Sequence, residues 1–267
     1  VSDSIALYSQ KYTDFLQVSL DKIPPFLAGT NSDPKKYAAI KSAWRSLAEL
    51  LLIGITNLED IEPNELSATA IYRSKQWQLL ISDTLDNGAG YASRYGEADD
   101  FSILLNYVQN GLAQEYFIAE AHSHSCISSC YKCLRNYENR LHHSDLDWRL
   151  ALDLLEILTS GSHSATTFGD AWEFIVREYL PVRLSQLLDE ELEVLTIEGQ
   201  VLYKSASSVL IPWHPFLGEG PKKEELKIVM SSRWDGVQVS TICPYSFIRS
   251  PMAEIQEIRN DLRIVDD

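Results

Sequence analysis

The sequence lacks the phosphate-binding loop that many ATPases use. Among its 267 residues no glycine is followed directly by lysine. The loop needs the pattern Gly-x4-Gly-Lys-Ser/Thr, in which backbone amides surround the phosphates and the lysine side chain reaches them. The chain therefore cannot by itself hydrolyse ATP at a site of this kind. Its nearest glycine-rich pattern, Gly88-x-Gly90, lacks the third glycine of a dinucleotide fingerprint and predicts a tight turn.

Long hydrophobic runs are also missing. The chain has no stretch of about 18 consecutive apolar residues, the length that a membrane-spanning helix needs. Its first residues do not show the basic-then-apolar layout of a secretory signal peptide. We therefore expect a cytoplasmic protein with no membrane contact. A start at Val1 suits a fragment of a longer polypeptide at least as well as a complete gene product.

Basic residues are scarce in this chain. Lys and Arg total 23 against 38 Asp and Glu, which gives a formal net charge of −15. Affinity for nucleic acid that is independent of sequence comes from neutralising phosphates with Lys and Arg. If DNA is involved, we expect another polypeptide segment to hold most of it. The apolar content of 45% is enough for a sizeable core in one large or two small domains.

Hydrophobic spacing predicts an α+β fold in two parts. We expect an unassigned lead-in at 1–34, a helix-rich module at 35–160, and a smaller mixed α/β unit at 168–267, with a Ser/Gly/Thr-rich linker between the last two. In the first part we expect a helix that starts near Pro34 and ends near Gly54, strands at 68–73 and 77–82, and helices at 101–112 and 150–158. In the second part we expect a helix at 172–179 that Pro181 interrupts, a hairpin at 194–203, strands at 209–213 and 237–243, and a helix at 222–230.

Three of the four cysteines lie within eight residues of one another. With a nearby histidine they form the pattern His124-x-Cys126-x3-Cys130-x2-Cys133. Thiolate and imidazole donors at such short spacing are typical of a closed tetrahedral zinc site, which stabilises structure and does no chemistry. The sequence therefore predicts one structural zinc ion. The spacing of Cys130 and Cys133 alone would also suit a redox-active dithiol.

The sequence offers several candidates for the fourth zinc ligand. His124 is preferred because its spacing keeps the loop compact. Other candidates lie near the cysteines or further along the chain: His122, His142, His143 and Cys243.

A local basic cluster follows the cysteines. It consists of Lys132, Arg135 and Arg140, and Tyr131 and Tyr137 lie among these residues. Such side chains contact phosphates or stack on bases in nucleic-acid complexes. They would equally pair with neighbouring acidic residues in so acidic a chain.

Several of these segments resemble a known module. The run from Cys130 to Asp153 is similar to the zinc-binding module, of the mitomycin-repair-factor type, near the C-terminus of bacterial superfamily-2 DEAD/DEAH-type helicases. It also resembles helicase-like proteins of anti-phage systems such as DISARM. Upstream, Asp83-Thr84-Leu85-Asp86-Asn87-Gly88-Ala89-Gly90 is similar to the family's D-T-x-x-G-G-A-G turn. The likeness covers about 35–158. Family members commonly use four cysteines, so a histidine in the first ligand position is a departure.

Two shorter segments in the second part also resemble helicase C-termini. His214-Pro215-Phe216 and Arg249-Ser250-Pro251 are similar to the family's H-P-L and R-R-P motifs. The resemblance implies a non-catalytic, zinc-stabilised module of an ATP-dependent DNA helicase in anti-phage defence or DNA repair. Its partner would be the helicase ATPase core, in the same chain or in another, and DNA would be contacted through the helicase.

One alternative of a different class stays open at this stage. The order of helix, hairpin and strand in the second part is compatible with a DNA nuclease that has a divergent restriction-like core. We find no Asp followed by Glu-x-Lys in suitable strands, which such a core would need.

Overall fold

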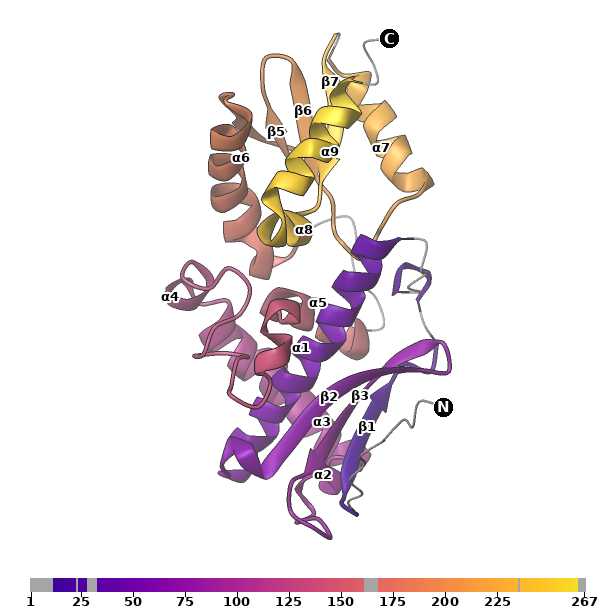
Figure 1. Ribbon diagram of the computed structural model, residues 1–267, viewed down its shortest axis with the longest axis vertical. Coiled ribbons are helices and arrows are strands. Elements are labelled where there is room, and N and C mark those ends of the chain that lie inside the picture. The colour runs from indigo at the N-terminus through magenta and orange to yellow at the C-terminus, as the bar shows by residue number, and fades with distance from the viewer. Residues whose placement is uncertain (1–11, 23, 28–32, 161–167, 235, 264–267) are drawn as a thin grey trace, which may run out of the picture.

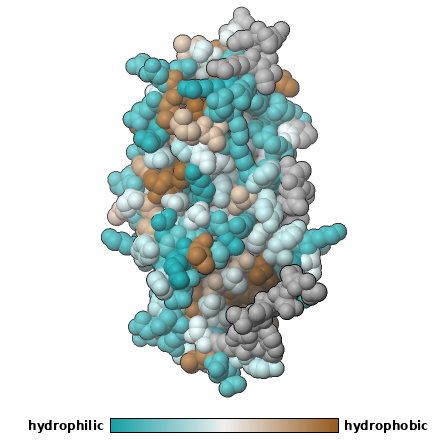
Figure 2. All heavy atoms as spheres, in the orientation of Figure 1, coloured by the Kyte–Doolittle hydropathy of each residue, from teal (hydrophilic) through white to brown (hydrophobic). Residues whose placement is uncertain are grey.

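The protein is an elongated molecule with a sheet near each end and helices between and around the sheets (Figure 1). This computed structural model describes residues 12–22, 24–27, 33–160, 168–234 and 236–263. Helices outnumber strands and the two sheets are separate, so the predicted α+β class is confirmed. None of the described helices is both long and apolar enough to cross a membrane. Figure 2 shows one face of the molecule, which is mostly hydrophilic and carries hydrophobic side chains only in small separate groups.

A long helix and a three-stranded sheet form the first half. Helix α1 (Pro34–Glu59) packs on an antiparallel sheet with the order β1-β3-β2. The strands are β1 (Phe15–Ser19), β2 (Leu66–Arg73) and β3 (Gln76–Asp83). The Asp33 carboxylate accepts the Lys36 N–H, which caps the start of α1. Strand β1 lies in the lead-in that the sequence left unassigned.

The prediction that α1 ends near Gly54 is wrong. The helix continues to Glu59 and ends where Asp60 adopts a left-handed conformation. Gly54 has another role, because a Cβ atom there would lie 2.6 Å from Val108 Cγ2 and 2.8 Å from Leu104 Cδ1. Its missing side chain lets a second helical segment approach α1 closely.

That second segment leads to the cysteines. It comprises α3 (Ala98–Asn106) and its continuation in wide π-type turns, η3 (Tyr107–Phe117). The short helices α2 (Tyr91–Arg94) and α4 (Glu120–Ser123) precede and follow it, and α5 (Trp148–Ser160) packs against α1. Short 3₁₀ segments occur at Pro25–Leu27, Pro63–Glu65, Arg140–Asp145 and Asp170–Trp172.

The second half contains a four-stranded sheet in the order β4-β5-β6-β7. Its helices are η6 (Ile175–Tyr179), which has wide π-type turns, α6 (Leu180–Leu188), α7 (Pro221–Ser231), α8 (Pro244–Arg249) and α9 (Pro251–Arg263). Its strands are β4 (Glu193–Ile197), β5 (Gln200–Lys204), β6 (Ser208–Pro212) and β7 (Gln238–Ile242). Strands β6 and β7 are parallel, and α7 makes the crossover between them.

The larger of two hydrophobic clusters spans both halves, and the smaller one lies within the second half. One cluster of buried side chains includes Trp148 and Leu154 from α5 together with Trp172, Tyr203 and Phe247 from the second half. Apart from Ser160, the predicted linker at 160–167 lies outside the described residues. The sequence boundary between the two parts therefore does not divide the core.

Candidate metal centre

Four donor atoms converge in the loop between η3 and α5. The ligating atoms of His122, Cys126, Cys130 and Cys133 all lie within 4.8 Å of one another. The Sγ atom of Cys133 is 3.8 Å from that of Cys126 and 3.5 Å from that of Cys130. The Sγ atom of Cys130 lies 3.8 Å from His122 Nε2. Tetrahedral zinc with bonds of about 2.3 Å to sulfur places ligand atoms roughly 3.8 Å apart, so the four donors can hold such an ion.

The structure places His122, and not the predicted His124, beside the three cysteines. His124 is exposed, its ring stacks on Phe174 at a centroid distance of 4.1 Å, and its Nδ1 lies 3.9 Å from Glu120 Oε1. The two histidines differ because the backbone is helical through His124, and side chains two residues apart in a helix point to roughly opposite sides. The prediction of His124, which was based on a compact loop, is therefore wrong. The donors that lie together have the spacing His122-x3-Cys126 in place of His124-x-Cys126.

His122 is held in the orientation that a metal ligand needs. Its Nδ1 lies 3.0 Å from the Phe117 carbonyl oxygen, which can only accept, so Nδ1 carries the proton and Nε2 is left free to ligate. The rings of Tyr116, Phe117 and Trp148 surround the imidazole at centroid distances of 4.9, 5.3 and 5.4 Å. The tautomer and the ring position are thus both fixed by groups outside the cluster.

The thiols influence one another strongly. A hydrogen bond from the Cys126 thiol, assisted by His122 and by the Cys130 backbone N–H at 3.0 Å, holds the pKa of the Cys133 thiol well below its ordinary value. The same contact with Cys133 raises the pKa of the Cys126 thiol. Cys133 therefore favours the thiolate, the form in which sulfur binds metals.

A buried arginine organises the backbone of the cysteine loop. The Arg149 side chain is fully buried and donates hydrogen bonds to the carbonyl oxygens of Ser123, Cys126 and Ile127, at 3.0, 3.2 and 2.7 Å. Burial lowers the pKa of Arg149 to about 10, so the guanidinium is still charged at neutral pH. Trp148 Nε1 donates to the Cys126 carbonyl as well, at 3.1 Å. Successive residues at the start of α5 thereby fix the loop that carries the donors.

Two acidic residues of the same region join the metal-centre half to the second half. Asp147 Oδ2 accepts from Arg249 Nη1 at 3.1 Å, and the Asp147 side chain is fully buried. Asp153 Oδ2 accepts from Trp172 Nε1 at 2.8 Å and lies 3.0 Å from His214 Nε2. His214 Nδ1 accepts the backbone N–H of Phe216, so Nε2 carries the proton and donates to Asp153.

The aspartate that follows β3 builds the glycine-containing turn. Its carboxylate is fully buried and accepts the backbone N–H groups of Ala89, Gly90 and Ala92 at 2.6, 2.7 and 2.9 Å. Asp83 therefore has all of these amides as structural partners. This arrangement agrees with a tight turn and not with a phosphate cradle, since the amides point at the protein's own carboxylate.

The predicted basic cluster lies on the outer side of the metal loop. Lys132 and Arg140 are exposed and Arg135 is half-buried. Arg140 lies over the Tyr137 ring at 4.4 Å, and Arg135 Nε donates to the Ser129 hydroxyl at 2.9 Å.

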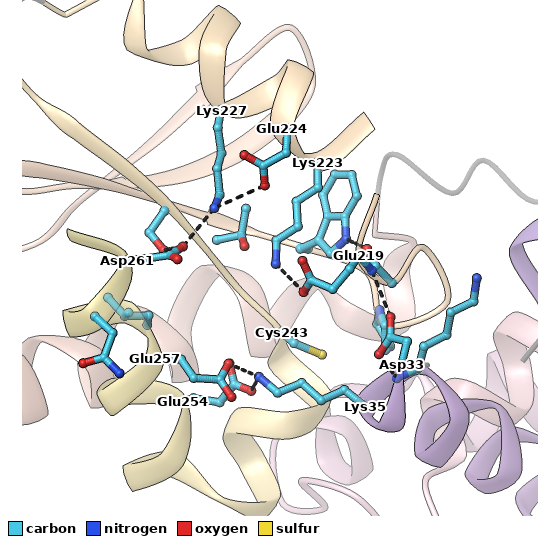
Figure 3. A pocket seen from close by; sticks show the side chains of 18 residues that line it. Asp33, Lys35, Glu219, Lys223, Glu224, Lys227, Cys243, Glu254, Glu257 and Asp261 are labelled. Atoms are coloured by element: carbon cyan, nitrogen blue, oxygen red, sulfur yellow. Dashed lines mark hydrogen bonds and ion pairs between the residues drawn. The ribbon is translucent and has the colours of Figure 1, made fainter. Parts of the chain in front are cut away.

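The remaining candidate ligands lie elsewhere. His143 Nε2 is 2.9 Å from the Asn136 carbonyl oxygen, and His142 Nδ1 is 3.2 Å from Arg45 Nη1. Cys243 lines a separate cavity of about 290 Å³ between α1, α7 and α9 (Figure 3). The charged side chains in that cavity are largely paired with each other, as Lys227 is with Asp261 at 2.9 Å and Lys223 with Glu219 at 2.6 Å. In the part of the chain that the structure describes, only the cluster around His122 brings metal donors this close together.

Comparisons of this chain with protein-family models, with curated proteins and with solved structures find no match.

Proposed function

We propose that the protein binds one structural zinc ion through His122, Cys126, Cys130 and Cys133. The observation that carries this proposal is the convergence of the four donors within 4.8 Å, with the proton of His122 held on the nitrogen that faces away from the cysteines. Three sulfur donors and one imidazole favour zinc over the hard cations, which prefer oxygen ligands. A centre with four protein ligands has no open position for a substrate, so its role is architectural.

The metal would connect the helices of the first half. His122 lies on α4, and Cys126 lies in the segment whose carbonyl oxygens Arg149 of α5 binds. Closing the loop around one ion fixes the end of η3 relative to the start of α5. Because binding energy of such a site is also folding energy, we expect loss of the metal to reduce stability before it affects any activity.

We further propose that the chain is a non-catalytic module of, or a partner to, an ATP-dependent DNA helicase in anti-phage defence or DNA repair. This proposal rests on the sequence resemblance. It is supported by the roles of the residues that carry the resemblance: Asp83 builds its turn, Arg149 holds the metal loop, and Asp147 and Asp153 bind Arg249 and His214. Each of these residues thus has a structural role, in the turn, in the metal loop or in the contact between the two halves.

Elemental analysis tests the metal part of the proposal. We expect about one zinc per wild-type chain and a large loss in Cys133→Ser, which removes one of four donors. Cys243→Ser is the matched control, because Cys243 lies outside the cluster and should leave the zinc content unchanged. A folded wild-type chain that binds no zinc at micromolar metal would contradict the proposal.

A second experiment tests the helicase part. The protein would be tagged at its chromosomal locus in the host, so that any longer natural polypeptide is preserved, and purified under gentle conditions. We expect DNA-stimulated ATP hydrolysis and strand separation in the purified material, whether the ATPase core lies in the same chain or in a partner. Zinc-loaded protein that carries no such ATPase would contradict this part while leaving the metal assignment intact.

A further inference from the structure

The outer side of the metal loop exposes large side chains on a well-fixed backbone. Tyr131, Tyr137 and Leu141 are 72%, 71% and 82% exposed. The loop between them is held by reciprocal hydrogen bonds of Asn136 and Asn139, whose side-chain oxygens accept each other's backbone N–H at 2.8 and 3.0 Å. The two aromatic rings are therefore presented to solvent by a rigid support.

The same loop is basic, although the chain is acidic. The segment between Tyr131 and Leu141 contains three basic residues and a single acidic residue, Glu138. Arg135 donates to a hydroxyl and Arg140 to the Tyr137 carbonyl, which are neutral acceptors. Neither these two nor Lys132 forms an ion pair with any residue that the structure describes. A local positive charge in a chain of net charge −15 indicates a surface that receives an anionic partner.

A groove continues this surface toward the second half. It has a volume of about 630 Å³, and Arg135, His143 and Arg249 are among the residues that line it. The ring of Tyr131 contacts that of His143 at a centroid distance of 5.3 Å, so the exposed tyrosine stands at its edge. Two acidic residues line the groove: Asp145 is bound by both Lys41 and Arg45, and Glu254 is bound by Lys35. These paired acidic groups therefore do not oppose an anion.

We propose that this loop binds single-stranded nucleic acid, with phosphates against Lys132, Arg135 and Arg140 and bases stacked on Tyr131 and Tyr137. Exposed aromatic rings beside uncompensated cations are the features that single-strand binding sites combine. Unpaired bases offer their flat faces to such rings, whereas the bases of a duplex are stacked on each other. The inference deepens the proposed function, because a separated strand is the product of a helicase.

The test measures the affinity of the zinc-loaded chain for a fluorescent oligothymidylate of about 12 nucleotides, within the usual range of site sizes. Anisotropy would be followed at several low salt concentrations. Three phosphate contacts predict a slope of log K against log salt of about −2. The double variant Lys132→Ala/Arg140→Ala should bind more weakly and shift that slope by about 1.4 toward zero.

The aromatic side chains are tested separately from the charges. Tyr131→Ala/Tyr137→Ala should lower the affinity at least about tenfold and leave the salt slope unchanged, because stacking releases no counterions. Lys75→Ala/Lys222→Ala removes the same charge as the basic double variant from exposed positions away from the loop, and should bind like the wild type. Zinc content confirms that each variant is folded around its metal.

Three results would overturn the inference. These are equal affinity for a blunt duplex, equally effective competition by polyglutamate, which would indicate an acidic protein partner, and loop variants that bind like the control. A preference for oligouridylate would support the single-strand site and contradict a DNA helicase. Binding that responds to the variants in a chain without an associated ATPase would contradict the helicase proposal alone.

Discussion

At the scale of single residues, one backbone carbonyl orients the histidine of the candidate metal centre. The Phe117 oxygen fixes the proton on His122 Nδ1, whereas the His124 ring lies flat on Phe174. We expect His122→Ala to lose most of its zinc and His124→Ala to keep about one ion per chain. Metal analysis of the two variants, prepared identically, checks this. Equal zinc loss in both would show that the ligand set differs from the one assigned.

A buried carboxyl group should make stability depend on pH. Burial raises the pKa of Glu49 from its ordinary value near 4.5 to about 7, although Asn136 and Asn139 oppose the shift by hydrogen bonding. The folded state therefore holds a proton that the unfolded chain releases, so stability falls as pH rises from about 4.5 to 7. Over this pH range the free energy of unfolding falls by about 3 kcal/mol in total.

Glu49→Gln removes this dependence, since glutamine resembles the protonated carboxyl group. We expect the variant to match the wild type near pH 4.5 and to exceed its stability by about 3 kcal/mol above pH 7. Urea unfolding at a series of pH values measures the difference. The exposed Glu225→Gln on α7 is the control and should follow the wild type. Parallel curves for wild type and Glu49→Gln would contradict the prediction.

At the scale of elements, helix propensity and side-chain packing make opposite demands at Gly54. Alanine is the better helix former by about 1 kcal/mol, but its methyl group would meet two fully buried side chains, Val108 and Leu104, at less than 3 Å. We therefore expect Gly54→Ala to lower the unfolding free energy by about 1–3 kcal/mol. Gly111→Ala is the matched control, because its Cβ would lie at ordinary contact distances of 3.5–3.6 Å. If Gly54→Ala proves as stable as Gly111→Ala, the close packing of α1 on the second helical segment does not require a glycine at position 54.

The elements that could be predicted from sequence are those with a local signal. Two short strand-like runs, the second followed by a glycine-containing turn, predict strands 68–73 and 77–82, which the structure confirms as the cores of β2 and β3. Strand β1 has only two buried residues, Leu16 and Val18, and is defined by its pairing with the distant β3. The predicted break at Pro181 is wrong because the wide turns of η6 precede α6 and place this proline in its first turn.

At the candidate metal centre, too, the residues with a local sequence pattern could be predicted and those that depend on distant contacts could not. The three cysteines could be found from their spacing, since that signal is local. The choice of His122 depends on the Phe117 carbonyl and on an aromatic surround that includes Trp148, which is 26 positions further along the chain. The role of Arg149 depends on carbonyl oxygens 22 to 26 residues away. The hydrophobic periodicity of the sequence does not predict contacts between residues this far apart.

At the scale of the whole molecule, the metal centre and the distant sheet should be energetically coupled. The core passes from α5 into the second half, where Tyr203 on β5 donates to the Val176 carbonyl at 2.6 Å. Removing zinc with a chelator should therefore accelerate amide hydrogen exchange in β5 and β6 as well as in the cysteine loop. Mass spectrometry of exchange, with and without restored zinc, measures this. Acceleration confined to the loop would show that the halves fold independently.

The contacts of α5 have a consequence for how this chain changes over generations. Asp147 pairs with Arg249 and Asp153 with His214, although each pair is separated by 61 residues or more in sequence. Loss of one partner leaves a buried polar group with one hydrogen bond fewer, so selection should favour the two members of each pair being inherited or replaced together. A shortened descendant that kept 35–158 alone would uncover both aspartates, so water or another protein would have to replace their partners.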